Sequence, residues 1–217
     1  MPNYTNSVWS ETAPAHGHQS LASDVTVDVA IVGAGITGVT AARLLKDAGL
    51  KVALIDSRRV GKGETSKTTA HLTEVLDTRL HQLIADFGED GARLAARGQR
   101  AAIERIATFV KERTIDCQFQ RVSGYLYAET EDGAKIVEQE ESAARRLGLS
   151  VVKVNQVPLP FPVARAVRFD DQAQFHPRVY LLALAEGIDG DGSHIFEQTH
   201  VIDVEEGGGD ELCRVTT

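Results

Sequence analysis

The chain of 217 residues has only two cysteines and no excess of basic residues, and these two features exclude several classes of protein. Cys117 and Cys213 are its two cysteines, too few for a disulfide framework and without the spacing of a metal-binding pair. Lysine and arginine number 23 against 31 aspartates and glutamates, which gives a net charge of −8. An acidic chain of this kind is poorly suited to the phosphate backbone of nucleic acid. We therefore expect no nucleic-acid partner, no metal site and no disulfide scaffold.

Long apolar runs are also missing. The longest, residues 29–39, contains three glycines and is far shorter than the ~20 apolar residues that cross a bilayer. The first 24 residues are polar and lack the basic-then-apolar order of a secretory signal. By elimination, these features predict a cytoplasmic protein with no membrane partner.

A complete strand–helix–strand pattern occupies residues 27–56. Residues 27–32 are mostly β-branched and apolar, as in a parallel strand that is covered on both faces. Helical spacing of apolar residues follows as far as Ala48, and Gly49 suits the end of that helix. Residues 51–56 then form a second apolar strand, which ends at Asp56.

The turn between the first strand and the helix has the pattern Gly-x-Gly-x-x-Gly. Gly33 permits a tight turn, Gly35 lets a pyrophosphate approach the backbone, and Gly38 lets the helix pack closely on the strands. The helix start supplies amide donors and a partial positive charge for the phosphates. Asp56 follows Gly38 by 18 residues, close to the ~20 expected of the acid that binds ribose hydroxyls. Together these residues predict a dinucleotide-binding fold.

The choice of dinucleotide depends on Asp56 and on the segment that follows it. An acidic side chain disfavours NADP, because the 2′-phosphate would meet a like charge. FAD and NAD remain open at this point. An NAD domain would continue with another helix and strand, whereas residues 57–73 form a segment rich in glycine and hydroxyl side chains. This segment favours FAD.

Residues 27–56 followed by the segment RVGKGETSKTTAHLT (59–73) resemble the amino-terminal half of the D-amino-acid-oxidase superfamily of FAD-dependent oxidoreductases. More narrowly, these residues resemble members of the superfamily that carry a carboxy-terminal Rieske iron–sulfur domain. It implies that the second loop contacts the pyrophosphate and the isoalloxazine edge, that His71 contacts the flavin without a catalytic role, and that Val201 offers its backbone to the adenine. The cofactor-binding residues expected from the motif and the resemblance are Gly33, Ala34, Gly35, Ile36, Thr37, Gly38, Asp56, Ser57, Gly63, Thr65, Ser66, Thr69, His71, Leu72 and Val201.

Periodicity predicts the remaining elements. Helices are expected over 76–87, 89–113, 135–147 and 177–186, and strands over 115–128, 151–154, 166–169, 172–175 and 195–205, the last leading into a hairpin whose second strand begins at about Leu212. Cys117 is expected within an alternating strand, and Tyr125 and Tyr127 in the core. We interpret His81 and the acidic run 138–141 as solvated helix surface.

The fold class expected is α/β, with a Rossmann-like FAD-binding domain interrupted by the start of an inserted α+β substrate domain. The expected parts are a polar N-terminal tail (1–24) in which Trp9 packs on the body, a first cofactor part (25–113), a partial substrate domain (114–175) and a return to the cofactor domain (176–217). The family's later strands and its Rieske ligands are not found in this sequence. The resemblance therefore implies a truncated chain, which a second chain or a missing half could complete.

The resemblance implies an amine or amino-acid oxidoreductase that transfers hydride from the carbon next to the substrate nitrogen to flavin N5. No catalytic residue is assigned, because most would lie in the part that is not in this sequence. Two alternatives stay open: a non-catalytic remnant or partner subunit that uses the dinucleotide-binding module structurally, and an NAD-dependent dehydrogenase.

Overall fold

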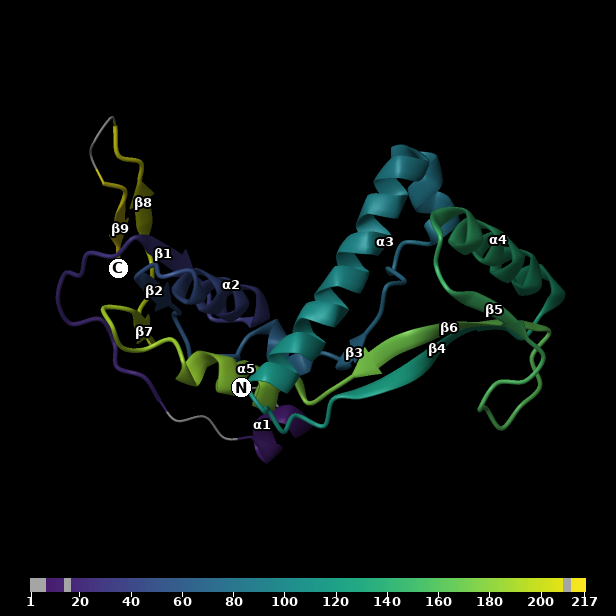
Figure 1. Cartoon of the computed structure of the whole chain (residues 1–217), viewed down its shortest axis with the longest axis horizontal. Coiled ribbons are helices and arrows are strands. Elements are labelled where there is room, and N and C mark those ends of the chain that lie inside the picture. Colours follow the sequence, from purple (N-terminus) through teal and green to yellow (C-terminus); the bar gives the residue numbers. More distant parts are fainter. Residues whose placement is uncertain (1–6, 14–16, 209–211) are drawn as a thin grey trace, which may run out of the picture. The chain divides into compact units, whose positions relative to one another are not determined.

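The computed structural model describes residues 7–13, 17–208 and 212–217, and these residues divide into two compact units (Figure 1). Unit 1 contains the described residues within 1–69, 115–117 and 176–217, and unit 2 contains residues 70–114 and 118–175. The predicted α/β class is confirmed. Within the described residues, no helix combines the length and the apolarity needed to cross a membrane.

A parallel sheet of three short strands forms the centre of unit 1. The strands are β1 (Val29–Val32), β2 (Val52–Ile55) and β7 (His194–Phe196), in the order β1-β2-β7. The middle strand β2 is buried along its whole length, as its unbroken apolar sequence predicts. Helix α2 (Ile36–Asp47) connects β1 to β2, so the strand–helix–strand pattern is confirmed.

Helix α2 packs on β1 and β2 and also on α5 (Pro177–Glu186). Helix α5 has the predicted bounds, with a proline in its first turn and Tyr180, Leu181 and Leu184 fully buried. The last turns of α2 also hold the chain that leaves α5. The Arg43 guanidinium donates to the Gly187 carbonyl oxygen at 2.5 Å, and the Lys46 ammonium donates to the Ile188 carbonyl oxygen at 2.8 Å.

Unit 1 also contains several short elements. Helix α1 (Val8–Thr12) begins at Ser7, whose hydroxyl accepts from the Ser10 amide, and the 3₁₀ helix η1 spans Glu64–Lys67. A helix was not expected in the polar N-terminal tail, of which residues 1–6 and 14–16 lie outside the described residues. Strands β8 (Asp203–Glu205) and β9 (Arg214–Thr216) pair antiparallel, as predicted for the hairpin, whose residues 209–211 also lie outside the described residues.

The sheet of unit 2 is antiparallel and centred on β6 (Arg165–Gln174). Strand β4 (Gln120–Ala128) pairs along one edge of β6, and β5 (Val151–Val154) and the short β3 (His71–Leu72) pair along the other. The two strands predicted at 166–169 and 172–175 are therefore one continuous strand.

The predicted start of β4 at residue 115 was wrong. Residues 115–117 belong to unit 1, where the Cys117 carbonyl oxygen accepts from the His176 amide at 2.7 Å. Ile115 and Cys117 are both buried, so the alternating residues that suggested a strand belong to the core of unit 1.

Helix α3 (Leu80–Glu112) corresponds to the two helices predicted on either side of Gly88. At that glycine φ is 72° and ψ is 170°, so the helical backbone is interrupted there. The first of these helices begins at Leu80, four residues later than predicted. Helix α4 (Glu131–Leu147) ends at Gly148, which has a left-handed φ of 82°.

Helix α4 packs on β4, β5 and β6, and α3 packs on α4; the core they share contains Leu80, Val137, Val167 and Phe169. Residues 70–114 lie in unit 2, where α3 packs on α4. Unit 1 resumes at His176. The domain boundaries expected after residues 113 and 175 stay predictions.

Two predictions about side chains in unit 2 were wrong. Tyr125 and Tyr127 are 39% and 38% exposed, because they alternate along β4 with Leu126 and Ala128, which face the helix-covered core. Glu140, expected on a solvated face, is fully buried on α4.

Candidate functional site

The glycine turn of residues 33–38 lies where β1 ends and α2 begins, as predicted. Gly33 has φ +105°, and its amide donates to the Ile55 carbonyl oxygen at 2.7 Å. A Cβ at Gly38 would lie 1.9 Å from the Gly33 carbonyl oxygen, so no other residue fits there. Gly33 is thus required by its backbone conformation and Gly38 by packing.

Gly35 is different, because neither its backbone nor its protein neighbours require a glycine. Its φ of −81° is ordinary, and a Cβ would meet only the Thr65 hydroxyl oxygen, at 3.5 Å, an ordinary contact distance. Space therefore remains in front of this residue at the start of a helix. The amides of Thr37 and Gly38 lie in the first turn of α2, where amides have no carbonyl partner within the helix. The turn thus offers a cradle of amide donors that a ligand phosphate fits.

Asp56, at the end of β2, fixes the glycine turn from the other strand. One carboxylate oxygen accepts from the Ala34 amide and the other accepts from the Arg58 amide, both at 2.7 Å. Each oxygen keeps a second lone pair, so the carboxylate can also accept from a ligand hydroxyl. The exposed Ser57 follows directly. The Asp56 carbonyl oxygen accepts from the Thr199 amide at 3.0 Å, which brings the segment leading to Val201 alongside.

The second loop, residues 61–69, lies against the start of α2. The Thr65 hydroxyl oxygen accepts from the Ile36 amide at 3.1 Å, and the Gly61 amide donates to the Ala34 carbonyl oxygen at 2.9 Å. Ser66 is buried, and its hydroxyl donates to the Gly63 carbonyl oxygen at 2.8 Å. The predicted residues of the two loops are therefore neighbours within unit 1.

Two buried charges hold the base of this loop, residues 60 and 61, and neither was predicted from the sequence. Arg178 of α5 is 2% exposed, and its guanidinium donates at 3.3 Å to the carbonyl oxygens of Val60 and Gly61. Glu197, just after β7, is fully buried and accepts from the Val60 amide at 2.8 Å. Burial lowers the pKa of Arg178, although the Glu197 charge acts in the opposite direction. Both residues come from the end of the chain, and no motif marks them.

His71 and Leu72, by contrast, belong to unit 2, while Thr69 is the last residue of the first segment of unit 1. His71 and Leu72 form β3 and pair with Gln174 and Ala173 of β6. Both line a cavity of about 550 Å³ within unit 2. Residues 73, 75–77, 79, 122–126 and 172–174 also line this cavity.

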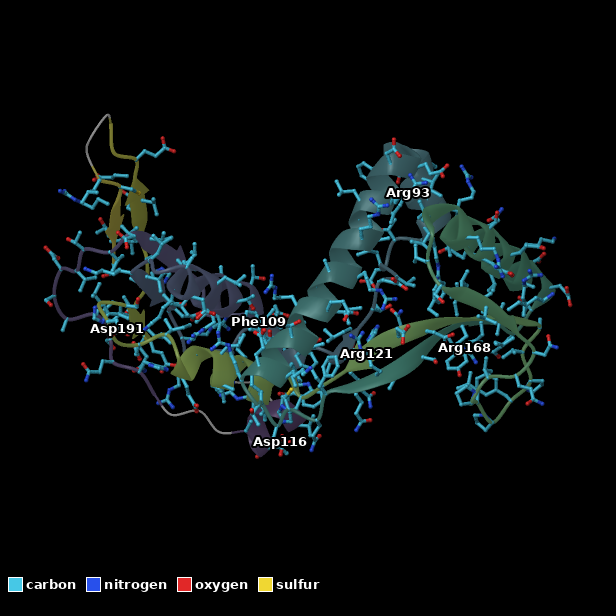
Figure 2. All side chains as sticks on the ribbon, viewed as in Figure 1. Arg93, Phe109, Asp116, Arg121, Arg168 and Asp191 are labelled. Carbon is cyan, nitrogen blue, oxygen red and sulfur yellow. The ribbon has the colours of Figure 1, made fainter. Side chains whose placement is uncertain are left out.

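A buried polar network supports one wall of that cavity. The Gln172 side chain, 2% exposed, accepts from the Glu74 amide at 2.8 Å and donates to the Glu74 carboxylate at 3.1 Å. Arg100 of α3 donates to both oxygens of this carboxylate, at 2.7 and 2.9 Å, and the pairing raises the pKa of Arg100. Arg100 and Arg121 both donate to the Asp171 carbonyl oxygen; Figure 2 marks Arg121 on β4. Residues so far apart in sequence gave no recognisable pattern.

Two curated sequences are similar to this chain. It is 35% identical over 199 residues to the putative Rieske 2Fe-2S iron-sulfur protein YhfW of Bacillus subtilis (strain 168), a match that covers 92% of this chain and 39% of that protein. It is 23% identical over 212 residues to gamma-glutamylputrescine oxidoreductase of Escherichia coli (strain K12), covering 94% of this chain and 50% of that enzyme.

Solved structures show the same fold. Glycine oxidase from Geobacillus kaustophilus superposes with a TM-score of 0.69 at 24% identity, over 82% of this chain and 48% of that one. L-amino acid deaminase from Proteus vulgaris gives a TM-score of 0.68 at 16% identity, over 90% of this chain and 45% of that one. The chain thus spans half or less of the length of each of these four relatives.

The resemblance drawn from residues 27–73 is confirmed by these matches, including the relative with a Rieske iron–sulfur name. The family model described as FAD dependent oxidoreductase matches residues 28–217. With its glycine turn, its acidic second strand end and this match, the chain belongs to the DAO family of FAD-dependent oxidoreductases.

Proposed function

We propose that unit 1 binds FAD across the glycine turn, Asp56 and the second loop, as the cofactor part of an enzyme that oxidises an amine or an amino acid. The observation that carries the proposal is Gly35. Gly35 lies at the start of a helix with open amide donors, and neither backbone strain nor packing requires a glycine there. A ligand that must approach the backbone accounts for this glycine.

Each predicted residue has a place in this proposal. The amides of Gly35, Thr37 and Gly38 bind the pyrophosphate, and the Asp56 carboxylate accepts from ribose hydroxyls beside Ser57. The backbone near Val201 faces the adenine. In the second loop, Gly63, Thr65, Ser66 and Thr69 border the cofactor, and Thr65 also orients the helix start through the Ile36 amide.

Unit 2 is proposed to open the substrate domain, with the cavity that His71 and Leu72 line as its substrate-binding part. The flavin contact expected of His71 and Leu72 stays a prediction. FAD, when bound, accepts a hydride from the carbon next to the substrate nitrogen, chemistry that belongs to the cofactor. The residues of this chain bind and orient. The names of the relatives, an oxidoreductase of gamma-glutamylputrescine, a glycine oxidase and an L-amino acid deaminase, support a substrate with an oxidisable carbon–nitrogen bond.

The test is FAD binding by the full chain and by Gly35→Ser. Serine is a good residue at a helix N-cap, so the FAD-free variant should melt at the temperature of the parent chain. Its side chain occupies the space in front of the turn, so the dissociation constant of FAD should rise at least about tenfold, or about 1.4 kcal/mol.

A titration with NAD accompanies this experiment. A parent chain that binds neither dinucleotide contradicts the proposal and supports a structural use of the module. Stabilisation by NAD in preference to FAD supports an NAD-dependent dehydrogenase instead. Unchanged FAD affinity in Gly35→Ser removes the observation on which the proposal depends.

A further inference from the structure

The N-terminal segment of unit 1 is fastened to the same residues that hold the second loop. We call residues 7–13 and 17–21 the N-terminal strap. At its start, the indole N–H of Trp9 donates to the Thr68 carbonyl oxygen at 2.9 Å. The indole also meets the His176 ring edge-on, with 4.9 Å between the ring centroids. Trp9 is the one tryptophan of the chain.

The end of α1 is held by α5. The Thr12 hydroxyl and the His176 Nε2 atom are 2.9 Å apart, and the Arg178 Nε atom donates to the Ala13 carbonyl oxygen at 2.6 Å. The same guanidinium donates to the carbonyl oxygens of Val60 and Gly61. Arg178 therefore joins the strap to the base of the second loop.

The second half of the strap repeats this arrangement with Glu197. One oxygen of this buried carboxylate accepts from the His18 amide at 3.0 Å, and the other accepts from the Val60 amide at 2.8 Å. The Glu197 amide donates to the Gln19 carbonyl oxygen at 3.1 Å. Two buried charges thus contact both the strap and the loop base, while Trp9 reaches the far end of the loop.

We infer that the strap orders the second loop for the cofactor and that Trp9 is its positioning residue; this rests on the proposed function. The side chains of the loop at Lys67, Thr68 and Thr69 are exposed, so this end is not held by burial. A loop ordered before binding loses less conformational freedom when the cofactor binds, and affinity increases accordingly. The Trp9 bond fixes the carbonyl immediately before Thr69, a proposed cofactor contact.

The experiment compares Trp9→Phe with Val8→Ala in the full chain. Phenylalanine keeps an aromatic ring beside His176 but has no N–H to donate to Thr68. Val8 lies on the same helix and is 59% exposed, which makes it the matched control. Amide hydrogen exchange is measured without FAD, and FAD affinity is measured by titration.

In Trp9→Phe, the amides of residues 63–69 should exchange about three- to tenfold faster, and the FAD dissociation constant should rise by a similar factor, the range expected for one hydrogen bond. Exchange in α4 of unit 2 and the melting temperature should match those of Val8→Ala. Unchanged loop exchange would overturn the inference. So would faster exchange spread equally over α2 and β2, since Trp9 would then act on the general stability of unit 1.

The exchange measurement also separates this inference from the proposed function. If the parent chain binds no FAD, the proposed function fails, and loop exchange in the FAD-free chain still decides whether Trp9 orders the loop. If FAD binds with equal affinity to the parent and to Trp9→Phe, the proposed function stands and the positioning role is overturned.

Discussion

Single residues of the glycine turn serve different purposes. Gly33 provides a positive φ, Gly38 provides close packing and Gly35 leaves space. A sequence pattern treats the three alike, but the consequences of substitution differ. Changes at Gly38 should act on folding, whereas changes at Gly35 should act on binding.

Gly38→Ala should destabilise the FAD-free chain by about 3 kcal/mol or more, because its Cβ would lie 1.9 Å from a backbone oxygen that cannot move freely. The matched control is Gly98→Ala, in the interior of α3, where a Cβ meets nothing within 4 Å. Alanine there should stabilise by up to about 1 kcal/mol. Urea unfolding measures both, and equal effects would contradict this account of the turn.

His176 gives unit 1 a dependence on pH. Its Nδ1 atom accepts from the Val179 amide at 3.2 Å and caps α5, so the neutral ring carries its proton on Nε2, facing Thr12. Burial, and to a smaller extent the charge of Arg178, lowers the pKa of His176. Below the ordinary histidine pKa of about 6.5, the unfolded chain therefore binds a proton that the folded ring resists.

The unfolding free energy should consequently be highest above about pH 6.5 and fall as the pH decreases below it. In His176→Asn the cap acceptor is retained but the titrating group is lost. This variant should lose less stability between pH 7 and pH 5 than the parent chain, measured by urea unfolding at each pH. Parallel pH profiles would show that His176 does not titrate differently on folding.

Among the elements, α3 depends on a capping residue from another helix. Its N-cap residue, Arg79, makes no side-chain cap. Instead, the buried Glu140 carboxylate of α4 accepts from the amides of Leu80 and His81, at 2.9 and 3.0 Å, and contacts the His81 ring. One side chain thus satisfies two amides at a helix end that is rich in unpaired donors.

Glu140→Ala should lower the unfolding free energy by about 2–3 kcal/mol, because these donors lose their acceptor in a buried setting. Glu138→Ala, on the same helix, removes a side chain that is 66% exposed and should change it by less than about 0.5 kcal/mol. Urea unfolding compares the two variants, and hydrogen exchange at residues 80–84 locates the effect. A loss at Glu138 as large as at Glu140 would contradict the capping role.

Elements whose pattern is local could be predicted well. β5 and α5 have the predicted bounds, and Gly88 interrupts α3 where expected, because apolar spacing and glycine act within a few residues. Elements decided by distant contacts could not. Cys117 is buried in unit 1, where its carbonyl oxygen accepts from the His176 amide, and Glu140 turns inward to cap a helix 60 residues away.

At the scale of the whole molecule, the candidate site also has one part that the sequence predicts and another that depends on distant contacts. The glycine turn and Asp56 lie next to each other in one strand–helix–strand unit, so their meeting was predictable from sequence. Arg178 and Glu197 reach the second loop because α5 and β7 return to unit 1 after the chain has completed unit 2, and β7 then pairs with β2. A single sequence does not reveal a pairing over more than a hundred residues.

Unit 1 is assembled from three separate segments of the chain, so a ligand bound there should stabilise segments from both ends of the sequence. At 100 times its dissociation constant, FAD should add about 2.7 kcal/mol to the unfolding free energy of the state that binds it. Hydrogen exchange should therefore slow in α2, in the second loop and in residues 197–201, while exchange in α4 and β5 of unit 2 changes little. The measurement is peptide-resolved exchange with FAD, with NAD as the matched control. Protection centred on α4 and β5 instead would place the cofactor in unit 2 and contradict the assignment of the glycine turn.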